Sequence, residues 1–201
     1  MSRQATDQIL LQARLDEAAS AALPAACAAA AAAWPGATIR RLAWSSTDGD
    51  AYAYLQLPQR LQLDAADLAP VSAAFAGALP AGAMPQVSRL EKAFELPGAS
   101  HGAEPSAHYV VEMDPETGWR DELLRWYDTE HMPGLASVPG TVHAARLLNH
   151  DHGPLSLACY DLVGPETLGS PPWLAVRGTE WSSRVRPHFT NTRRTMFEIA
   201  G

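Results

Sequence analysis

The sequence predicts an α+β fold in which two tandem βαββαβ repeats pack sheet to sheet as one eight-stranded barrel. Three observations support this prediction. Two segments recur at nearly the same offset, both halves of the chain show the same order of strand and helix patterns, and each predicted sheet keeps an apolar face that its own helices leave open.

The repeat is visible directly in the sequence. The segment "AFELPG", which ends at Gly98, returns as "MFEIAG", which ends at Gly201, 103 positions later. Upstream, "WPGATIRRLAWSS" contains Gly36 and returns as "VPGTVHAARLLNH" with Gly140, 104 positions later. Because two well-separated pairs give almost the same offset, the similarity indicates an internal duplication.

The first half begins with an alternating strand pattern at 7–15. An alanine-rich helical stretch at 16–33 is expected to end at the Pro35–Gly36 pair, since proline disfavours helix at the residue before it and glycine suits the turn. Two strand patterns then flank the turn sequence "STDGD", and a second helical stretch leads to a last strand. These later elements are expected at 37–45, 50–57, 64–78 and 84–95.

The second half repeats this order. A strand pattern at 107–114 precedes a helical stretch at 117–131, which is again followed by a Pro-Gly pair. The order βαββαβ defines the ferredoxin-like unit, so we expect one unit at 1–98, a linker at 99–106 and a second unit at 107–201. The remaining elements are expected at 141–148, 155–162, 165–178 and 188–199.

A ferredoxin-like unit covers one sheet face with its helices and leaves the other face open. Apolar side chains alternate along the predicted strands, as at Tyr52 and Tyr54, so the open face must meet a partner. The other half of the chain supplies that partner, and eight strands closed in this way hold side chains or one small ligand. We therefore expect a monomer with a pseudo-dimeric barrel, with a homodimer as the alternative.

Charge and composition exclude several classes of function. A net charge of −7 and a pI of about 5.4 argue against a nucleic-acid partner, which needs clustered Lys and Arg; the arginines near the C-terminus are the local exception. The two cysteines, Cys27 and Cys159, are typical of reduced thiols. No signal-peptide pattern is present, and the apolar run at 24–34 is shorter than the roughly 20 residues of a membrane span. We therefore expect a cytoplasmic protein without a membrane partner.

The segment "RWYDTEHMP" is the strongest candidate for chemistry. On an α-helix, Tyr127, Asp128 and His131 share one face, and Trp126 and Glu130 share the adjacent face. A histidine oriented by a carboxylate is what a general base needs. We predict His131 as the base, Asp128 or Glu130 as its orienter, Tyr127 as a proton donor and Trp126 as a substrate contact. The alternative is a structural cap, because a cationic histidine is favourable at a helix C-terminus.

The repeat bears on this candidate. The position 104 residues before His131 is Cys27, within an alanine-rich stretch, so the first half has no counterpart of the acid-histidine cluster. Since one half can do without the cluster, we expect one site per chain, located in the second half.

The second half resembles the dimeric α/β-barrel superfamily and, within it, the EthD-like and related bacterial proteins. The resemblance covers 107–201 and rests on "LLRWYDTEHMPGLASVPG", the strand pair after it and the closing "RVRPHFTNTRRTMFEI". It implies a barrel that two chains usually build, and a histidine at the end of the first helix that points toward the cavity. Members include small monooxygenases, haem-degrading enzymes, lactone isomerases and polyketide cyclases, so the resemblance indicates the fold more narrowly than the reaction.

Four further residues are candidates for substrate binding. Trp173 and Trp181 are candidates for an aromatic pocket, although aromatic residues are more often part of the core. His188 is a candidate for facing the cavity from the last strand, with a surface histidine as the alternative. Arg193 is a candidate for holding a substrate carboxylate through both its guanidinium nitrogens, with a solvated arginine or an ion pair as the alternative.

No cofactor motif is present: the sequence has no Gly-x-Gly-x-x-Gly after a strand, no phosphate loop and no Gly-x-Ser-x-Gly elbow. The histidines of "NHDHG" lie at a predicted hairpin tip without completing ligands, so no metal site is expected. Haem is an alternative partner of His131, since some members of the superfamily bind haem through a helix histidine and the sequence does not separate this role from base catalysis.

The sequence thus predicts a small-molecule enzyme that binds an apolar or aromatic compound in the barrel cavity. His131 would act as general base in an isomerase, cyclase, lyase or cofactor-independent monooxygenase step. The alternative is a non-enzymatic protein on the same fold that binds a small ligand or takes part in a stress response.

Overall fold

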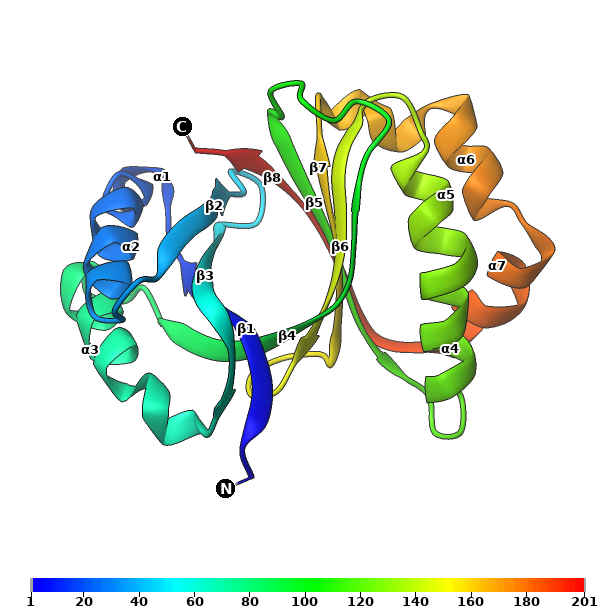
Figure 1. Ribbon diagram of the computed structural model, residues 1–201. Coiled ribbons are helices and arrows are strands. Elements are labelled where there is room, and N and C mark those ends of the chain that lie inside the picture. The colour runs from blue at the N-terminus through cyan, green and yellow to red at the C-terminus, as the bar shows by residue number, and fades with distance from the viewer. Residues whose placement is uncertain (1, 201) are drawn as a thin grey trace. The chain divides into compact units, whose positions relative to one another are not determined.

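The computed structural model describes residues 2–200 and confirms the predicted fold class (Figure 1). Within this range eight strands follow one another in the hydrogen-bonded order β1-β3-β2-β8-β5-β7-β6-β4, which closes as a barrel. The pairs are antiparallel, as between β1 and β3 and between β5 and β7. The strands are β1 (Gln4–Arg14), β2 (Thr38–Trp44), β3 (Asp50–Leu63), β4 (Gln86–Pro97), β5 (Ala107–Pro115), β6 (Thr141–Asn149), β7 (Ser156–Leu162) and β8 (Phe189–Ile199).

The helices of the first half follow the predicted stretches. The Asp16 carboxylate accepts a hydrogen bond from the backbone N–H of Ala19 and so begins the first short helix. Asp64 and Asp67 form a reciprocal capping box at the start of the second stretch. The elements are α1 (Glu17–Ser20), α2 (Leu23–Ala32), a 3₁₀ turn (Ala65–Leu68) and α3 (Ala69–Ala78).

The second half carries more helix than predicted. The first stretch continues beyond His131, and an additional helix, α7, precedes the last strand. Thr179 begins α7 by accepting a hydrogen bond from the N–H of Ser182 at 3.1 Å. The elements are α4 (Arg120–Trp126), a π turn (Tyr127–His131), α5 (Met132–Ala136), a 3₁₀ turn (Pro165–Gly169), α6 (Pro171–Arg177), α7 (Glu180–Val185) and a short 3₁₀ turn (Arg186–His188).

The chain divides into two compact units. Unit 1 contains 2–92, 149–153 and 197–200, and unit 2 contains 93–148 and 154–196. The division differs from the predicted repeat boundaries because β4 begins in unit 1 and ends in unit 2, whereas β8 begins in unit 2 and ends in unit 1.

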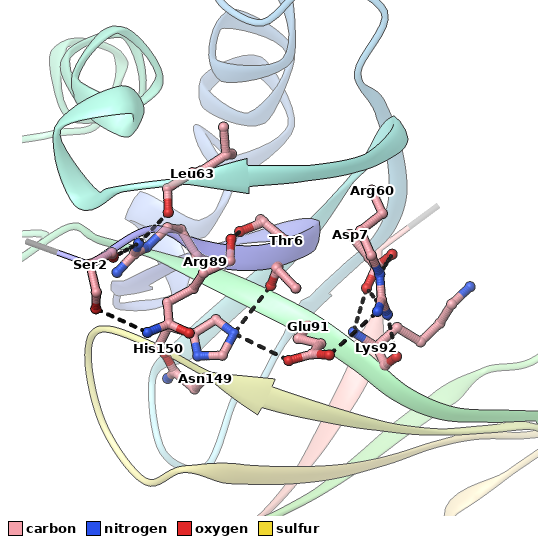
Figure 2. Close-up of polar contacts among 12 residues, drawn as sticks. Ser2, Thr6, Asp7, Arg60, Leu63, Arg89, Glu91, Lys92, Asn149 and His150 are labelled. Carbon is pink, nitrogen blue, oxygen red and sulfur yellow. Dashed lines mark hydrogen bonds and ion pairs between the residues drawn. The ribbon is translucent and has the colours of Figure 1, made fainter.

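A buried ion pair ties the segment 149–153 into unit 1. The Arg89 guanidinium donates to both carboxylate oxygens of Asp151, at 3.0 and 2.8 Å, and to the Leu63 carbonyl at 2.6 Å. His150 Nε2 lies 3.8 Å from the Glu91 carboxylate (Figure 2). Asp151 and His150 of "NHDHG" therefore both have partners within unit 1.

The two units fill the layer between helices and sheet with side chains of different size. In unit 1 the alanine-rich α2 buries Ala26, Cys27 and Ala30 completely. In unit 2 the corresponding layer holds large aromatic side chains, among them Trp126 and Trp173. Small residues let a helix lie close to its sheet, whereas bulky aromatic rings hold it further away and leave room between them.

No helix within residues 2–200 combines the length and the apolar character needed to cross a membrane.

Candidate functional site

A pocket lies in unit 2 between the sheet and the helices that cover it. Its empty volume is about 370 Å³ with the mouth included, but the centre of a water molecule fits in only about 30 Å³ of it. The sheet supplies Tyr109, Val111, Tyr160, Phe189 and Arg194. The helices and turns supply Trp126, Tyr127, His131, Leu135, Trp173, Arg177 and Arg186.

The pocket is not where the sequence analysis placed the ligand. We expected His131 to face the barrel cavity, but it lies on the opposite, helix-covered face of its sheet. The strand residues that share its pocket, Tyr109 and Tyr160, belong to the aromatic core under the helices of unit 2. In Figure 1, α4 to α7 lie together on one side of β5 to β7.

The helix that carries His131 contains a π turn, which the sequence analysis missed. The N–H of Met132 donates to the carbonyl of Tyr127, five residues earlier, and α5 then continues the helix to Ala136. Pro133 was expected to end the helix but instead occupies the first turn of α5, where its missing N–H matters little. The extra residue in the turn changes which side chains share a face.

This change of phase brings Trp126 and His131, five positions apart, into contact. Their rings stack at a centroid distance of 4.2 Å with an interplanar angle of 24°. Tyr127 meets His131 edge to face at 5.5 Å. The predicted proximity of Tyr127 and His131 is therefore present, whereas the contact with Trp126 was not expected, and the neighbours around the imidazole are aromatic rather than acidic.

The predicted orienters of His131 bind elsewhere. Asp128 accepts from Nε and Nη2 of Arg146 on β6, at 2.8–2.9 Å. Glu130 accepts from Trp126 Nε1 at 3.1 Å and from the Thr179 hydroxyl at 2.7 Å. Both expectations assumed the spacing of an α-helix, and the π turn invalidates that assumption.

The imidazole of His131 is buried and neutral. Only 8% of the residue is exposed, and its Nδ1 is buried without a hydrogen-bond partner among the described residues. Burial, together with the smaller effect of the positive charges of Arg186 and Arg177, lowers the pKa of His131 to about 3. At neutral pH the imidazole is thus available to accept a proton, although a base with so low a pKa is weak.

Three tyrosines surround the same pocket. Burial raises the pKa of Tyr127 and Tyr160 far above the ordinary value, and it raises the pKa of Tyr109 as well. The Tyr160 hydroxyl donates to Met132 Sδ at 3.0 Å. All three side chains are therefore neutral phenols, which can donate hydrogen bonds but do not compete with His131 as bases.

Three arginines add positive charge at the pocket. Arg177 ends α6, Arg186 follows α7, and Arg194 lies on β8. Burial lowers the pKa of Arg186, and the charges of Arg177 and Arg194 lower it further, so the three guanidinium groups are close enough to repel one another. The pocket therefore combines aromatic walls with unusually high positive charge.

Of the remaining predicted residues, Trp173 lines the pocket and is 1% exposed. Trp181 instead donates to the Glu122 carboxylate at 2.9 Å and lies under the guanidinium groups of Arg125 and Arg184. The predicted role of Trp181 in lining the site is therefore not supported by its position.

His188 and Arg193 also lie outside the pocket lining. His188 stacks on Trp119 at 3.4 Å and bonds to the Glu116 carboxylate at 2.6 Å. Arg193 Nε lies 3.5 Å from the Glu112 carboxylate, so the ion-pair alternative describes its place.

Arg194, rather than the predicted Arg193, lines the pocket. Arg193 and Arg194 point to opposite faces of β8, since side chains alternate along a strand. Asn191, with a φ of 47°, disturbs the regular alternation of side chains within β8. Phe189 and Arg194 therefore both face the pocket although they are five positions apart. The signal that could have found Arg186 and Arg194 is the local excess of arginine near the C-terminus, in an otherwise acidic chain.

Solved structures with the same fold cover nearly the whole chain. An anthrone oxidase-like protein matches 100% of this chain and 94% of its own, with 15% identity and a TM-score of 0.65. A heme-degrading enzyme from Listeria monocytogenes matches 96% of this chain and 99% of its own, with 7% identity and a TM-score of 0.55. The chain has the dimeric α/β-barrel fold. The predicted fold is thereby confirmed.

A third dimeric α/β-barrel neighbour is a ferredoxin-fold protein from Listeria monocytogenes related to antibiotic biosynthesis monooxygenases. It matches 98% of this chain and 96% of its own, with 8% identity and a TM-score of 0.53. Neither the protein families scanned nor the curated proteins searched gave a match to the sequence.

The pocket does not fit haem, although one dimeric α/β-barrel neighbour degrades it. The pocket accommodates only about 30 Å³ of water-centre positions, far less than a porphyrin needs. Within residues 2–200, no group of three His, Cys, Asp or Glu side chains is placed to hold a metal ion. We therefore derive no step through haem or a metal.

Proposed function

We propose that the protein is a small-molecule enzyme whose chemistry takes place in the pocket of unit 2, with His131 as general base. The observation that supports this most strongly is a neutral, nine-tenths buried histidine whose Nδ1 has no partner among the described residues, inside an aromatic pocket. A buried polar atom without a partner is costly in a folded protein, so such a group indicates a binding or catalytic role.

The proposed reaction begins with proton abstraction from a carbon next to a carbonyl group. The C–H bond breaks, the proton moves to an imidazole nitrogen of His131, and the electron pair is delocalised onto the substrate oxygen. The Tyr127 ring lies edge to face with His131, and in this proposal its hydroxyl donates a hydrogen bond to that oxygen. Isomerisation, cyclisation, elimination or a reaction of the carbanion with oxygen are the steps open to such an intermediate.

The low pKa of His131 sets a condition on this mechanism. Burial and two positive charges hold the pKa at about 3 in the free protein. A negative charge that develops on the substrate opposes the arginine charges and favours the protonated imidazole, which raises the pKa during the reaction. The base therefore becomes effective when substrate fills the pocket.

Two structural neighbours support the same class of chemistry. One is anthrone oxidase-like, and another is related to antibiotic biosynthesis monooxygenases. Both descriptions concern reactions of small molecules, and the similarity to this chain is one of fold.

Deuterium exchange tests the proposal without knowledge of the natural substrate. A panel of 1,3-dicarbonyl compounds is incubated with the protein in D₂O, and deuterium at the acidic carbon is followed by mass spectrometry, with oxygen uptake measured in parallel. We expect exchange of at least one compound that binds, and its loss in His131→Ala with binding retained. His188→Ala, a histidine outside the pocket, is the matched control and retains exchange. Exchange that survives in His131→Ala contradicts the proposed base.

A non-enzymatic ligand-binding protein is the second candidate. The specific observation in its favour is the same low pKa of His131, because a histidine with a pKa of about 3 is a poor base in the free protein. Compounds that bind saturably in the pocket without any exchange or turnover would favour this candidate.

A further inference from the structure

We propose that the ligand of this pocket is an aromatic or otherwise apolar compound that carries a carboxylate or a comparable anionic group, and that Arg177, Arg186 and Arg194 hold that group. The inference rests on the proposed site and specifies its substrate class, which the sequence analysis left as apolar or aromatic.

The first support is that these three arginines, which line one pocket, lack carboxylate partners that several other arginines of unit 2 have. Arg146 binds Asp128, and both Arg125 and Arg184 bind Glu122. Arg177, Arg186 and Arg194 have no carboxylate within ion-pair distance among residues 2–200. In a chain with net charge −7, three arginines without acidic partners at one pocket are unexpected unless a ligand supplies the negative charge.

The second support is the mutual repulsion of the three groups. They come from three separate elements, the end of α6, the turn after α7 and β8, yet all three line one pocket, where burial and then the charges of Arg177 and Arg194 lower the pKa of Arg186. Bringing like charges together in a partly buried place costs free energy. A bound anion removes this repulsion and forms charge-assisted hydrogen bonds, which are stronger than those between neutral groups.

The third support is a pair of buried polar atoms that lack hydrogen-bond partners. Trp173 Nε1 and His131 Nδ1 both belong to residues that line the pocket, and neither has a partner among the described residues. The indole N–H is a donor only, so it matches an acceptor such as a carboxylate oxygen. Two independent orphaned atoms at the arginine-lined pocket therefore indicate a polar ligand group.

The size of the pocket agrees with a small ligand that combines an anionic group with an aromatic ring. The empty volume of the pocket is about 370 Å³ with the opening included, which restricts the ligand to a small molecule. The aromatic walls, including Phe189 and Tyr109, suit a ring. Benzoate and its neutral isostere benzamide therefore form a matched pair of probes.

The test compares the affinities of benzoate and benzamide by calorimetry and by NMR of labelled protein. We expect benzoate to bind at least about tenfold more tightly than benzamide in the wild type. Arg186→Gln should reduce this ratio to near one, and Arg186→Lys should restore part of it. Arg184→Gln, which removes an arginine paired with Glu122 outside the pocket, should leave the ratio unchanged. The melting temperature of each variant shows whether it is folded.

Three results overturn the inference: equal affinity for the two probes, no binding of benzoate at tens of millimolar, or an equal loss in Arg184→Gln and Arg186→Gln. The outcome is separable from that of the proposed function. Benzoate preference without deuterium exchange of any compound refutes the base and leaves the anion site intact. Exchange that depends on His131 without anion preference refutes the arginine site alone.

Discussion

Asp128 gives the most informative stability prediction, because the sequence and the structure assign it different roles. Its carboxylate holds Nε and Nη2 of Arg146, whose side chain is only 3% exposed, and the third nitrogen, Nη1, is buried without a partner. In Asp128→Ala all three guanidinium nitrogens of Arg146 therefore lack a partner in the layer between helix and sheet.

The expected magnitude follows from this burial. Removing one partner of a buried ion pair costs about 3–5 kcal/mol. Asp128 itself is 37% exposed, so water reaches the vacated position, and we expect the lower end, about 3 kcal/mol. For a chain of this length that corresponds to a fall of about 6–12 °C in melting temperature.

Urea unfolding and a thermal scan measure the change. The double variant Asp128→Leu/Arg146→Met is the control, because replacing both charges by apolar groups removes the unpaired charge, and we expect it to be more stable than Asp128→Ala. A loss below about 1 kcal/mol in Asp128→Ala would refute the reasoning. If Asp128→Ala instead changes the pKa of His131 and leaves the stability unchanged, Asp128 orients His131 as the sequence predicted.

Three further predictions concern other parts of the chain. Burial tends to raise the pKa of Asp151, but the hydrogen bonds and charge of Arg89 outweigh this effect and hold the pKa below its ordinary 3.8. The ion pair therefore stabilises the fold above pH 3.8, and this stabilisation is lost as the pH falls through the lower folded pKa. Acid unfolding of Asp151→Asn should show a shallower pH dependence than that of the wild type. Burial raises the pKa of the Cys27 thiol to about 12, so a maleimide should label it only in unfolded protein; rapid labelling of the folded protein would contradict its burial. Gly98→Ala should destabilise because the added Cβ overlaps a backbone carbonyl of β6, whereas Gly77→Ala, in open space on α3, should stabilise by up to about 1 kcal/mol in urea unfolding.

Much of the fold could be predicted from the sequence because strands and turns leave local signals. The expected strands at 107–114 and 141–148 lie within one residue of β5 and β6. Alternation of apolar residues and Pro-Gly pairs are local features, and the repeat supplied each element with a second example. The helix α7 was missed because its start depends on the single cap Thr179, within a stretch that carries no clear periodicity.

The site could be predicted only in part, because its geometry depends on a helix phase that no local rule indicates. His131, Tyr127, Trp126 and Trp173, all chosen from the sequence because aromatic side chains and a histidine stand out in an alanine-rich chain, line one pocket, and their roles there stay predictions. The partner of His131 was wrong because a π turn shifts the face by one residue.

The pocket arginines illustrate a second reason why the site could be predicted only in part. Arg177, Arg186 and Arg194 come together from three elements that lie close together in the chain and whose relative placement is set by tertiary packing, and the face of β8 on which Arg194 lies depends on the irregular backbone at Asn191. Tertiary assembly of this kind leaves no spacing in the sequence.

The central claim is that His131 is a neutral base in a pocket that receives an anionic ligand. NMR of the protein with isotope-labelled histidine, titrated with acid and then with benzoate, tests it most directly. The account predicts that the His131 ring stays neutral well below the ordinary histidine pKa of 6.5, and that benzoate shifts its signals saturably and raises its pKa while the signals of His188 do not change. A His131 ring that titrates near 6.5 and does not respond to benzoate would contradict the account.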